Sequence, residues 1–234
     1  MDVDEFLHSG LALKLDKPVG DGPLCIVDSS FNPPNFAHIK LAQLGLEQVP
    51  NSTVVFLLAT GNADKPAAST TQLTHRAELM RRAALYVDPT GSRVRVGLTT
   101  APFFIDKALA FHNEFNANRL LFIVGYDTLV RFVDQKYYKE PVSQVLDRFF
   151  DISEMIVLTR YDESVKDKIK IHPKAQTETA DKLVGKHHSK VHFVLSQDDT
   201  AEVSSSRART SLQDLEACCP PSVVEYVQEN NLYS

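Results

Sequence analysis

Short apolar runs alternate with helical patterns along nearly the whole chain, and this alternation limits the possible folds more than any other feature. We predict strands at Leu24–Val27, Val54–Ala59, Val94–Leu98, Leu120–Val124, Met155–Thr159 and Val191–Leu195. Strands that are separated by helices usually pair in parallel, because each helix returns the chain to the same end of the sheet. The sequence therefore predicts an α/β fold, namely a doubly wound, Rossmann-like open parallel sheet with helices on both faces.

Helical patterns fill the segments between these strands. Thr74 suits an N-cap, and the helix that it opens must end before Pro89. Serine caps open the last two candidates. The predicted helices are Phe36–Gln48, Thr74–Val87, Phe104–Asn116, Ser204–Ala217 and Ser222–Asn230.

Length and composition predict a single domain over residues 1–234. The chain is 43% hydrophobic, which is enough to build a sizeable core. Residues 161–190 are polar, rich in lysine and without clear periodicity. We interpret them as a surface insertion rather than a second domain.

Charge and cysteine content exclude several classes of protein. A net charge of −5 argues against nucleic acid as a partner, because nucleic-acid binding requires a basic face. No apolar run reaches the length of a membrane span, and the acidic N-terminus resembles no secretory or mitochondrial leader. The three cysteines have neither disulfide-framework nor metal-ligand spacing. We expect a cytoplasmic and/or nuclear protein without a metal site of its own.

A doubly wound sheet binds its ligand beyond the carboxyl ends of its strands. Five polar or small-residue segments follow predicted strands and are candidates for the site. They are Ser29–His38, Thr60–Lys65, Gly125–Asp127, Arg160 and Ser196–Ser206.

The first segment has the parts of a nucleoside triphosphate site. Ser29, Ser30 and Phe31 follow a buried strand, and His38 lies in the first turn of the next predicted helix. A helix N-terminus provides unpaired N–H groups and a positive dipole, and His38 adds a side-chain donor. A histidine in this place can also cap or pack locally.

The segment after the last predicted strand leads into residues 203–209, which carry three serines and two arginines. If a helix begins there, Ser205 and Ser206 provide hydroxyls and N–H donors, and Arg209 reaches back from the next turn toward the same anion. An N-cap followed by a solvated basic face is the alternative.

Weaker signals come from the other segments. Gly125 allows close approach of a ligand to the backbone, and Asp127 can accept a hydrogen bond from a ribose, although an ordinary turn with an Asp cap explains both. Lys65, Arg76 or Arg160 could neutralise a second phosphate, or lie solvated on the surface. Tyr137, Tyr138, Phe103 and Phe104 could stack on a heteroaromatic ring, or belong to the core.

Taken together, these segments resemble the nicotinamide mononucleotide adenylyltransferases of the nucleotidylyltransferase superfamily. Residues 29–33 with His38 are similar to that family's G-S-F-N-P segment and histidine signature, and residues 203–209 to its I-S-S-T-K-I-R segment. Residues 125–129 resemble G-A-D-L-L, residues 156–160 resemble V-V-V-T-R, and the tail at 224–233 resembles its closing Y-I-x-x-H-x-L-Y. The resemblance covers most of the chain.

The resemblance implies a role for each matching residue. His38, Ser205, Ser206 and Arg209 would hold the phosphates of ATP, with His38 and Arg209 as the catalytic pair. Ser29, Ser30 and Phe31 would line the nucleotide path, and Gly125 and Asp127 would hold a ribose. Lys65 would lie near the acceptor phosphate and Tyr138 near the position of an acceptor-stacking tryptophan. The chain departs from the family at Ser29, Asn35 and Ala37 and has no tryptophan, as in divergent fungal members.

The implied reaction is in-line transfer of AMP from ATP to nicotinamide mononucleotide (NMN), with Mg²⁺ bridging phosphates. Another phosphomonoester acceptor, such as nicotinate mononucleotide or phosphopantetheine, stays open. So does an ATP-binding or ATP-hydrolysing regulatory protein whose acceptor site has decayed. A homo-oligomer is also left open.

Overall fold

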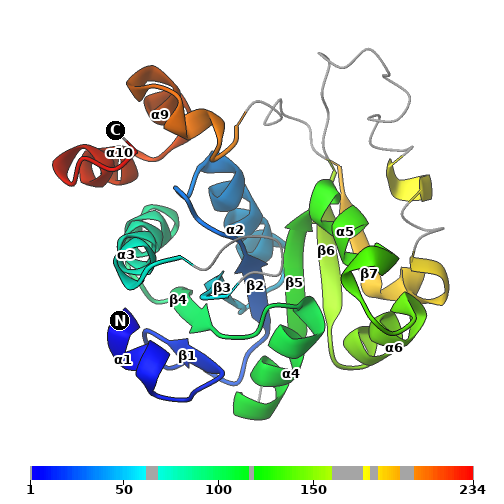
Figure 1. The fold of residues 1–234 in the computed structure, drawn as a ribbon. Coiled ribbons are helices and arrows are strands. Elements are labelled where there is room, and N and C mark those ends of the chain that lie inside the picture. Colours follow the sequence, from blue (N-terminus) through cyan, green and yellow to red (C-terminus); the bar gives the residue numbers. More distant parts are fainter. Residues whose placement is uncertain are drawn as a thin grey trace.

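The computed structural model describes residues 2–61, 68–115, 119–159, 176–179, 184–195 and 203–233. Within these ranges seven strands form one sheet, in the order β1-β4-β3-β2-β5-β6-β7 (Figure 1). β2 to β7 run parallel, and β1 pairs antiparallel with β4 at the edge. The strands are β1 Leu13–Leu15, β2 Leu24–Asp28, β3 Thr53–Ala59, β4 Val94–Thr99, β5 Leu120–Gly125, β6 Glu154–Leu158 and β7 Val191–Val194.

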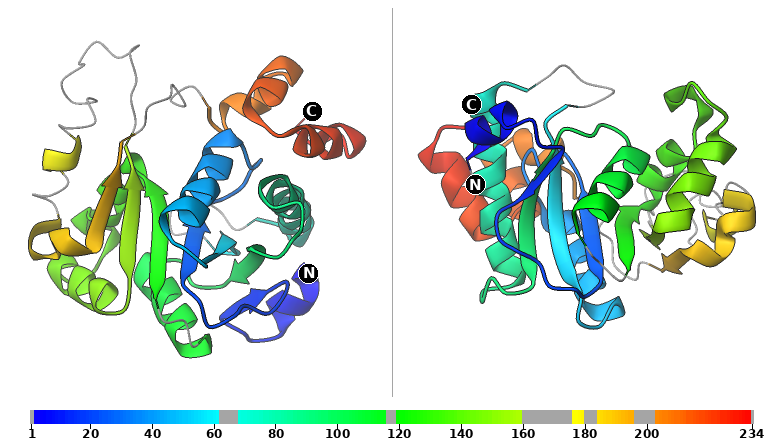
Figure 2. Two further views of the ribbon diagram at one scale, coloured as in Figure 1. Left: turned by 180° about the vertical axis from the view of Figure 1, so that it is seen from behind. Right: turned by 90° about the horizontal axis from the view of Figure 1, so that it is seen from below.

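Helices cover both faces of the sheet (Figure 2). One face packs against α2 (Phe36–Gln48) and α3 (Thr70–Val87). α1 (Val3–His8), α9 (Leu212–Cys218) and α10 (Pro221–Glu229) extend the same apolar cluster, with α1 and α10 packed against α3. The other face packs against α4 (Phe104–Glu114), α5 (Tyr126–Phe132) and α6 (Val142–Ile152). Side chains of β2 alternate between the two cores, with Val27 in the first and Ile26 in the second. The predicted doubly wound α/β fold is confirmed.

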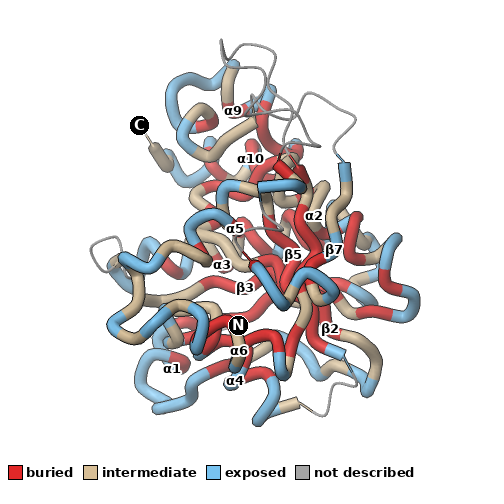
Figure 3. Tube along the Cα trace, turned by 90° about the vertical axis from the view of Figure 1, so that its right-hand side faces the viewer, coloured by how far each residue is buried: buried red, intermediate tan, exposed pale blue. Residues whose placement is uncertain are grey.

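The central strands are the most buried part of the chain (Figure 3). Each of the six predicted strands is present within one or two residues of its expected bounds. β1 was not predicted, because three residues with one buried side chain give no strand pattern. α1, α5, α6 and the 3₁₀ turn η1 (Gln135–Tyr137) were not predicted either, although Val145, Leu146, Phe149 and Phe150 have the spacing of one helical face.

The predicted start of the second helix is wrong. α3 begins at Thr70, and Ser69 is its N-cap; the Ser69 hydroxyl accepts from Gln72 N, while the Gln72 side chain accepts from Ser69 N. This reciprocal pair is a capping box. Thr74 lies inside the helix, where its hydroxyl donates to Thr70 O at 2.9 Å.

The predicted helix over residues 204–217 is also wrong. A 3₁₀ turn, η4 (Arg207–Arg209), comes first, and α9 starts separately where the Ser211 hydroxyl accepts from Asp214 N at 3.1 Å. Ser222 lies within the first turn of α10 rather than capping it, because Pro220 is the N-cap. In each case another residue is the N-cap: Ser69 for α3, Ser211 for α9 and Pro220 for α10.

The expected insertion over residues 161–190 lies partly outside the described residues. Its described parts are the helical residues 176–179 and the 3₁₀ helix η2 (Gly185–Lys190), which leads into β7. Among the helices that the structure describes, none has both the length and the apolarity for crossing a membrane.

Candidate active site

The winding of the sheet reverses between β2 and β5. From β2 the chain continues to β3 and β4 on one side, and β5 begins the run to β6 and β7 on the other. Neighbouring parallel strands whose connections diverge leave a crevice at their carboxyl ends, where ligands bind in folds of this type. Residues 29–35 follow β2 and Gly125 ends β5, so both predicted segments meet at this point.

Asn35 organises the segment after β2. It is the N-cap of α2, and its side-chain oxygen accepts from the backbone N–H groups of Ala37 and His38. Its own backbone N–H donates to His38 Nδ1 at 3.0 Å. Because Nδ1 is the acceptor there, a neutral His38 carries its proton on Nε2. That nitrogen lies 2.8 Å from Ser29 Oγ.

His38 is a neutral donor at physiological pH. Burial lowers the pKa of its imidazole to about 4, because the charged form loses its hydration. The ring therefore presents an N–H dipole rather than a positive charge at the end of β2. This orientation is set by the cap of α2 rather than by a carboxylate.

The segment 203–209 is joined to the loop after β2 by its side chains. Ser205 Oγ donates to Pro33 O at 2.7 Å and accepts from Asn35 Nδ2 at 3.1 Å. Arg209 Nη1 donates to Asn32 O at 2.5 Å and to Ser205 O at 2.9 Å. The structure therefore brings together Ser29, His38, Ser205 and Arg209, as the sequence predicted.

Not every predicted donor has its expected form. Because η4 replaces the continuous helix, Arg207 N donates to the Ser204 hydroxyl at 3.1 Å rather than pointing free toward an anion. Ser206 lies exposed on the same turn, and its carbonyl accepts from Arg209 N. Ser30 is partly buried beside Ser29.

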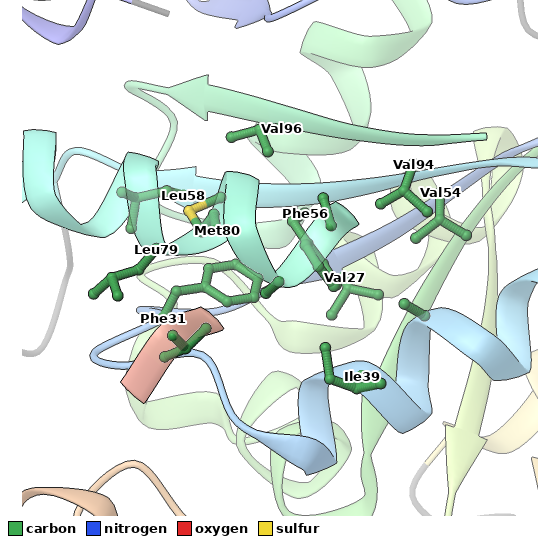
Figure 4. Packing of buried hydrophobic residues seen from close by; sticks show 14 of the residues in the cluster. Val27, Phe31, Ile39, Val54, Phe56, Leu58, Leu79, Met80, Val94 and Val96 are labelled. Atoms are coloured by element: carbon green, nitrogen blue, oxygen red, sulfur yellow. The ribbon is translucent and has the colours of Figure 1, made fainter. Parts of the chain in front are cut away.

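Phe31 has a different place from the one expected. Its ring is fully buried and lies near Phe56 in the core (Figure 4). The distance between ring centroids is 5.2 Å to Phe56 and 4.9 Å to His38. The ring therefore belongs to the core, which leaves the backbone of Phe31 as the part that would line the nucleotide path. The Phe31 ring instead packs against the imidazole of His38. Phe31 also adopts a φ of +43°, a conformation that costs energy for a bulky residue.

The segment after β5 is more open. Gly125 is the N-cap of α5, and among the described residues, its chain neighbours and the α5 backbone apart, no atom lies within 4 Å of the place where a Cβ would stand. Asp127 is exposed in the first turn of α5. The Tyr138 hydroxyl donates to Phe132 O at 2.8 Å, and its ring lies 6.1 Å from that of Phe103. Tyr138 therefore has only a ring face to offer a ligand.

Sequence reasoning gave no role to a buried ion pair beside the site. Lys107 Nζ lies 2.6 Å from Asp28 Oδ2, and the two side chains are 5% and 12% exposed. The pair ties α4 to the last residue of β2, directly before Ser29. A lysine on the apolar side of the Phe104–Glu114 helix was the available signal, because a buried lysine requires a partner. Asn35 was named only as a departure, although Asn before a helix is a common N-cap.

Lys65, Arg160 and the expected loop residues 196–202 lie outside the described residues. Among the residues that the structure does describe, no group of three or more His, Cys, Asp or Glu side chains could hold a metal ion.

The fold and the switch-point site define a cytidylyltransferase-like protein. The model of that family matches residues 26–211, which span both halves of the site, and the chain belongs to this family. Its fold is shared with a *Plasmodium falciparum* nicotinic acid mononucleotide adenylyltransferase solved with NaAD, at a TM-score of 0.64 and 15% identity over 91% of this chain and 97% of that one.

Two curated relatives are named as nucleotide adenylyltransferases. A putative nicotinamide mononucleotide adenylyltransferase of *Schizosaccharomyces pombe* is 35% identical over 143 residues, or 61% of this chain. The match spans 55% of that protein's length. A probable nicotinate-nucleotide adenylyltransferase of *Trichlorobacter lovleyi* is 23% identical over 90% of this chain and 98% of its own length.

Proposed function

We propose that this chain is an adenylyltransferase that transfers AMP from ATP to NMN and forms NAD and pyrophosphate. The supporting observation is the hydrogen-bonded joining of the loop after β2 to residues 205–209. It brings the Arg209 guanidinium to the switch point, beside the Ser29 hydroxyl and the His38 Nε2–H. Such donors complement a polyphosphate.

In the proposed reaction a phosphate oxygen of the acceptor attacks the α-phosphorus of ATP in line. The new P–O bond forms as the bond from the α-phosphorus to the bridging oxygen breaks, and pyrophosphate leaves with that electron pair. His38 would donate from Nε2 to an α-phosphate oxygen in place of its present partner, Ser29 Oγ. Arg209 would offset charge on the leaving group. Catalysis then rests on positioning and charge stabilisation, with no covalent enzyme intermediate.

We propose that Mg²⁺ enters with the nucleotide. The described residues offer donors of hydrogen bonds around this site rather than a carboxylate cluster, which suits an ion held mainly by phosphate oxygens and water. When bound, the ion would neutralise part of the polyphosphate charge.

On the acceptor side, Gly125 and Asp127 would hold a ribose and the ring of Tyr138 would stack on the pyridine. The open space beside the Gly125 Cα supports close approach of a sugar there. NMN is favoured as acceptor by the *S. pombe* relative and nicotinate mononucleotide by the bacterial one.

A dinucleotide-formation assay tests the proposal. Purified protein with ATP and Mg²⁺ is offered NMN, nicotinate mononucleotide and phosphopantetheine in parallel. We expect NAD and pyrophosphate in equal amounts, with NMN as the best acceptor. No product with any of the three, together with calorimetric binding of ATP but not of NMN, would indicate the ATP-binding regulatory protein instead.

A further inference from the structure

Arg76, a second arginine near Arg209, has a buried N–H group without a hydrogen-bond partner among the described residues. Arg76, in the second turn of α3, has its Nε buried, and no acceptor for it is found within the part of the chain that the structure describes. A buried N–H without a partner costs free energy, so its persistence calls for a ligand or another explanation.

Arg76 is close to the loop after β2 through two neighbours. Burial lowers the pKa of the Arg76 guanidinium, and the charge of Arg209, which is bonded to Asn32 O, adds a smaller decrease. Tyr233 also acts electrostatically on Arg76, and its hydroxyl donates to Asn32 Oδ1 at 2.8 Å. Two guanidinium groups that repel each other beside one polar loop form a place for an anion.

Residues 230–233 are tied to α3 by the helix that precedes them. Tyr226 of α10 bonds to His75 Nδ1 at 3.0 Å, and the Arg82 guanidinium lies 4.8 Å from the centre of the Tyr226 ring. Tyr233 is thereby held in reach of Asn32. Burial raises the pKa of Tyr233 to about 12, so its hydroxyl keeps its proton and remains a donor.

We propose that Arg76 binds the pyrophosphate portion of the nucleotide beside Arg209, and that Tyr233 is a positioning residue that holds Asn32 so that both guanidiniums face one anion. The inference rests on the proposed function for the identity of that anion. Both arginines would bind oxygens of the β- and γ-phosphates, which leave together as pyrophosphate, while His38 serves the α-phosphate. Arg76 thus accounts for a leaving-group site rather than an acceptor site.

Calorimetry with inorganic pyrophosphate and with AMP tests Arg76. Arg76→Gln should lower pyrophosphate affinity about ten-fold or more, the usual scale for a charge-assisted contact, and leave AMP affinity unchanged. Arg81→Gln is the matched control, because Arg81 lies on the same helix and pairs with Glu78 at the surface. Unchanged pyrophosphate affinity in folded Arg76→Gln overturns the proposal, as does an equal loss for both ligands.

If Arg76→Gln fails to fold, Arg76→Lys decides the question, because it keeps the charge and loses the planar fork. Its pyrophosphate affinity should fall several-fold, and an unchanged value overturns the proposal. Tyr233→Phe should raise the KM for ATP several-fold with little change in kcat or in the KM for the acceptor; an unchanged KM for ATP would remove the positioning role. Wild-type protein that binds pyrophosphate through Arg76 but forms no dinucleotide would refute the transfer reaction and keep the anion site.

Discussion

The two sides of the switch point are held in place by different kinds of contact. After β2, the His38 ring is held by Ser29 and Asn35 of its own segment. Ser205 and Arg209 are bonded to the same loop at residues 32–35, although they lie far from it in sequence. After β5, Asp127 is exposed, and the Tyr138 hydroxyl donates to a carbonyl six residues away. The first side is therefore pre-organised by the fold, whereas the second is built from local structure. Changes on the first side should affect every turnover, and changes on the second only the choice and binding of acceptor.

The largest effect should come from His38. His38→Ala removes the Nε2 donor from the α-phosphate, and we expect dinucleotide formation to fall by about 10²- to 10³-fold, as for loss of one oxyanion donor. His112→Ala, an exposed histidine on α4, is the control and should leave the rate unchanged. Steady-state rates with saturating ATP and NMN measure this, and a variant as fast as its parent would remove His38 from the mechanism.

A subtler change on the same side concerns Asn35. Asn35→Asp keeps the N-cap acceptor but loses the Nδ2 donor to Ser205, whereas Asn35→Ala loses both. We expect Asn35→Ala to lower the free energy of unfolding by about 1–2 kcal/mol, the usual cost of a lost cap, and Asn35→Asp by less. Denaturant unfolding and the KM for ATP are the measurements. Equal losses in the two variants would show that the N-cap acceptor adds nothing, and an Asn35→Asp variant like its parent would show that the Ser205 contact does not matter.

On the acceptor side, Tyr138 gives a smaller and more selective effect. Tyr138→Ala removes a ring that could stack on the pyridine, and we expect the KM for NMN to rise about ten-fold, in line with roughly 1–1.5 kcal/mol for an aromatic pair. The KM for ATP should not change. Tyr138→Phe keeps the ring and should bind NMN almost normally. A rise in the KM for ATP instead would place Tyr138 on the wrong side of the comparison.

The response to pH should separate activity from stability. Since the folded-state pKa of His38 is about 4 and its ordinary value is 6.5, the unfolded chain binds this proton first as the pH falls. Stability linked to His38 is complete above pH 6.5 and decreases toward pH 4, by at most about 3 kcal/mol. Chemical unfolding of wild type and His38→Asn at pH 7 and pH 5 measures this loss of stability. An equal change in the free energy of unfolding of the two proteins would contradict the low pKa of His38. Between pH 6 and 8 the activity should show no step from His38.

The sheet and the groups after β2 could be predicted because their signals are local. The strands have continuous apolar runs, and α2 occupies the predicted range, Phe36–Gln48. The errors arose where distant contacts or a competing cap decide. Phe31 follows a strand, so its position suggested a loop residue, but its ring packs in the core against Phe56 and His38. Tyr233 meets Asn32, and Arg76 comes near Tyr233 and Arg209, through tertiary packing, which no spacing in the sequence encodes.

The contact between Tyr233 and Asn32 has a consequence for the order of events during synthesis. The last strand of the sheet ends at Val194, whereas Ser205, Arg209 and Tyr233 follow it along the chain. A ribosome therefore releases every strand before it releases the residues that close the loop after β2. A nascent chain with the complete sheet would still lack the contacts that Ser205, Arg209 and Tyr233 make with the loop after β2. Nucleotide binding should therefore begin only when α10 packs against α3.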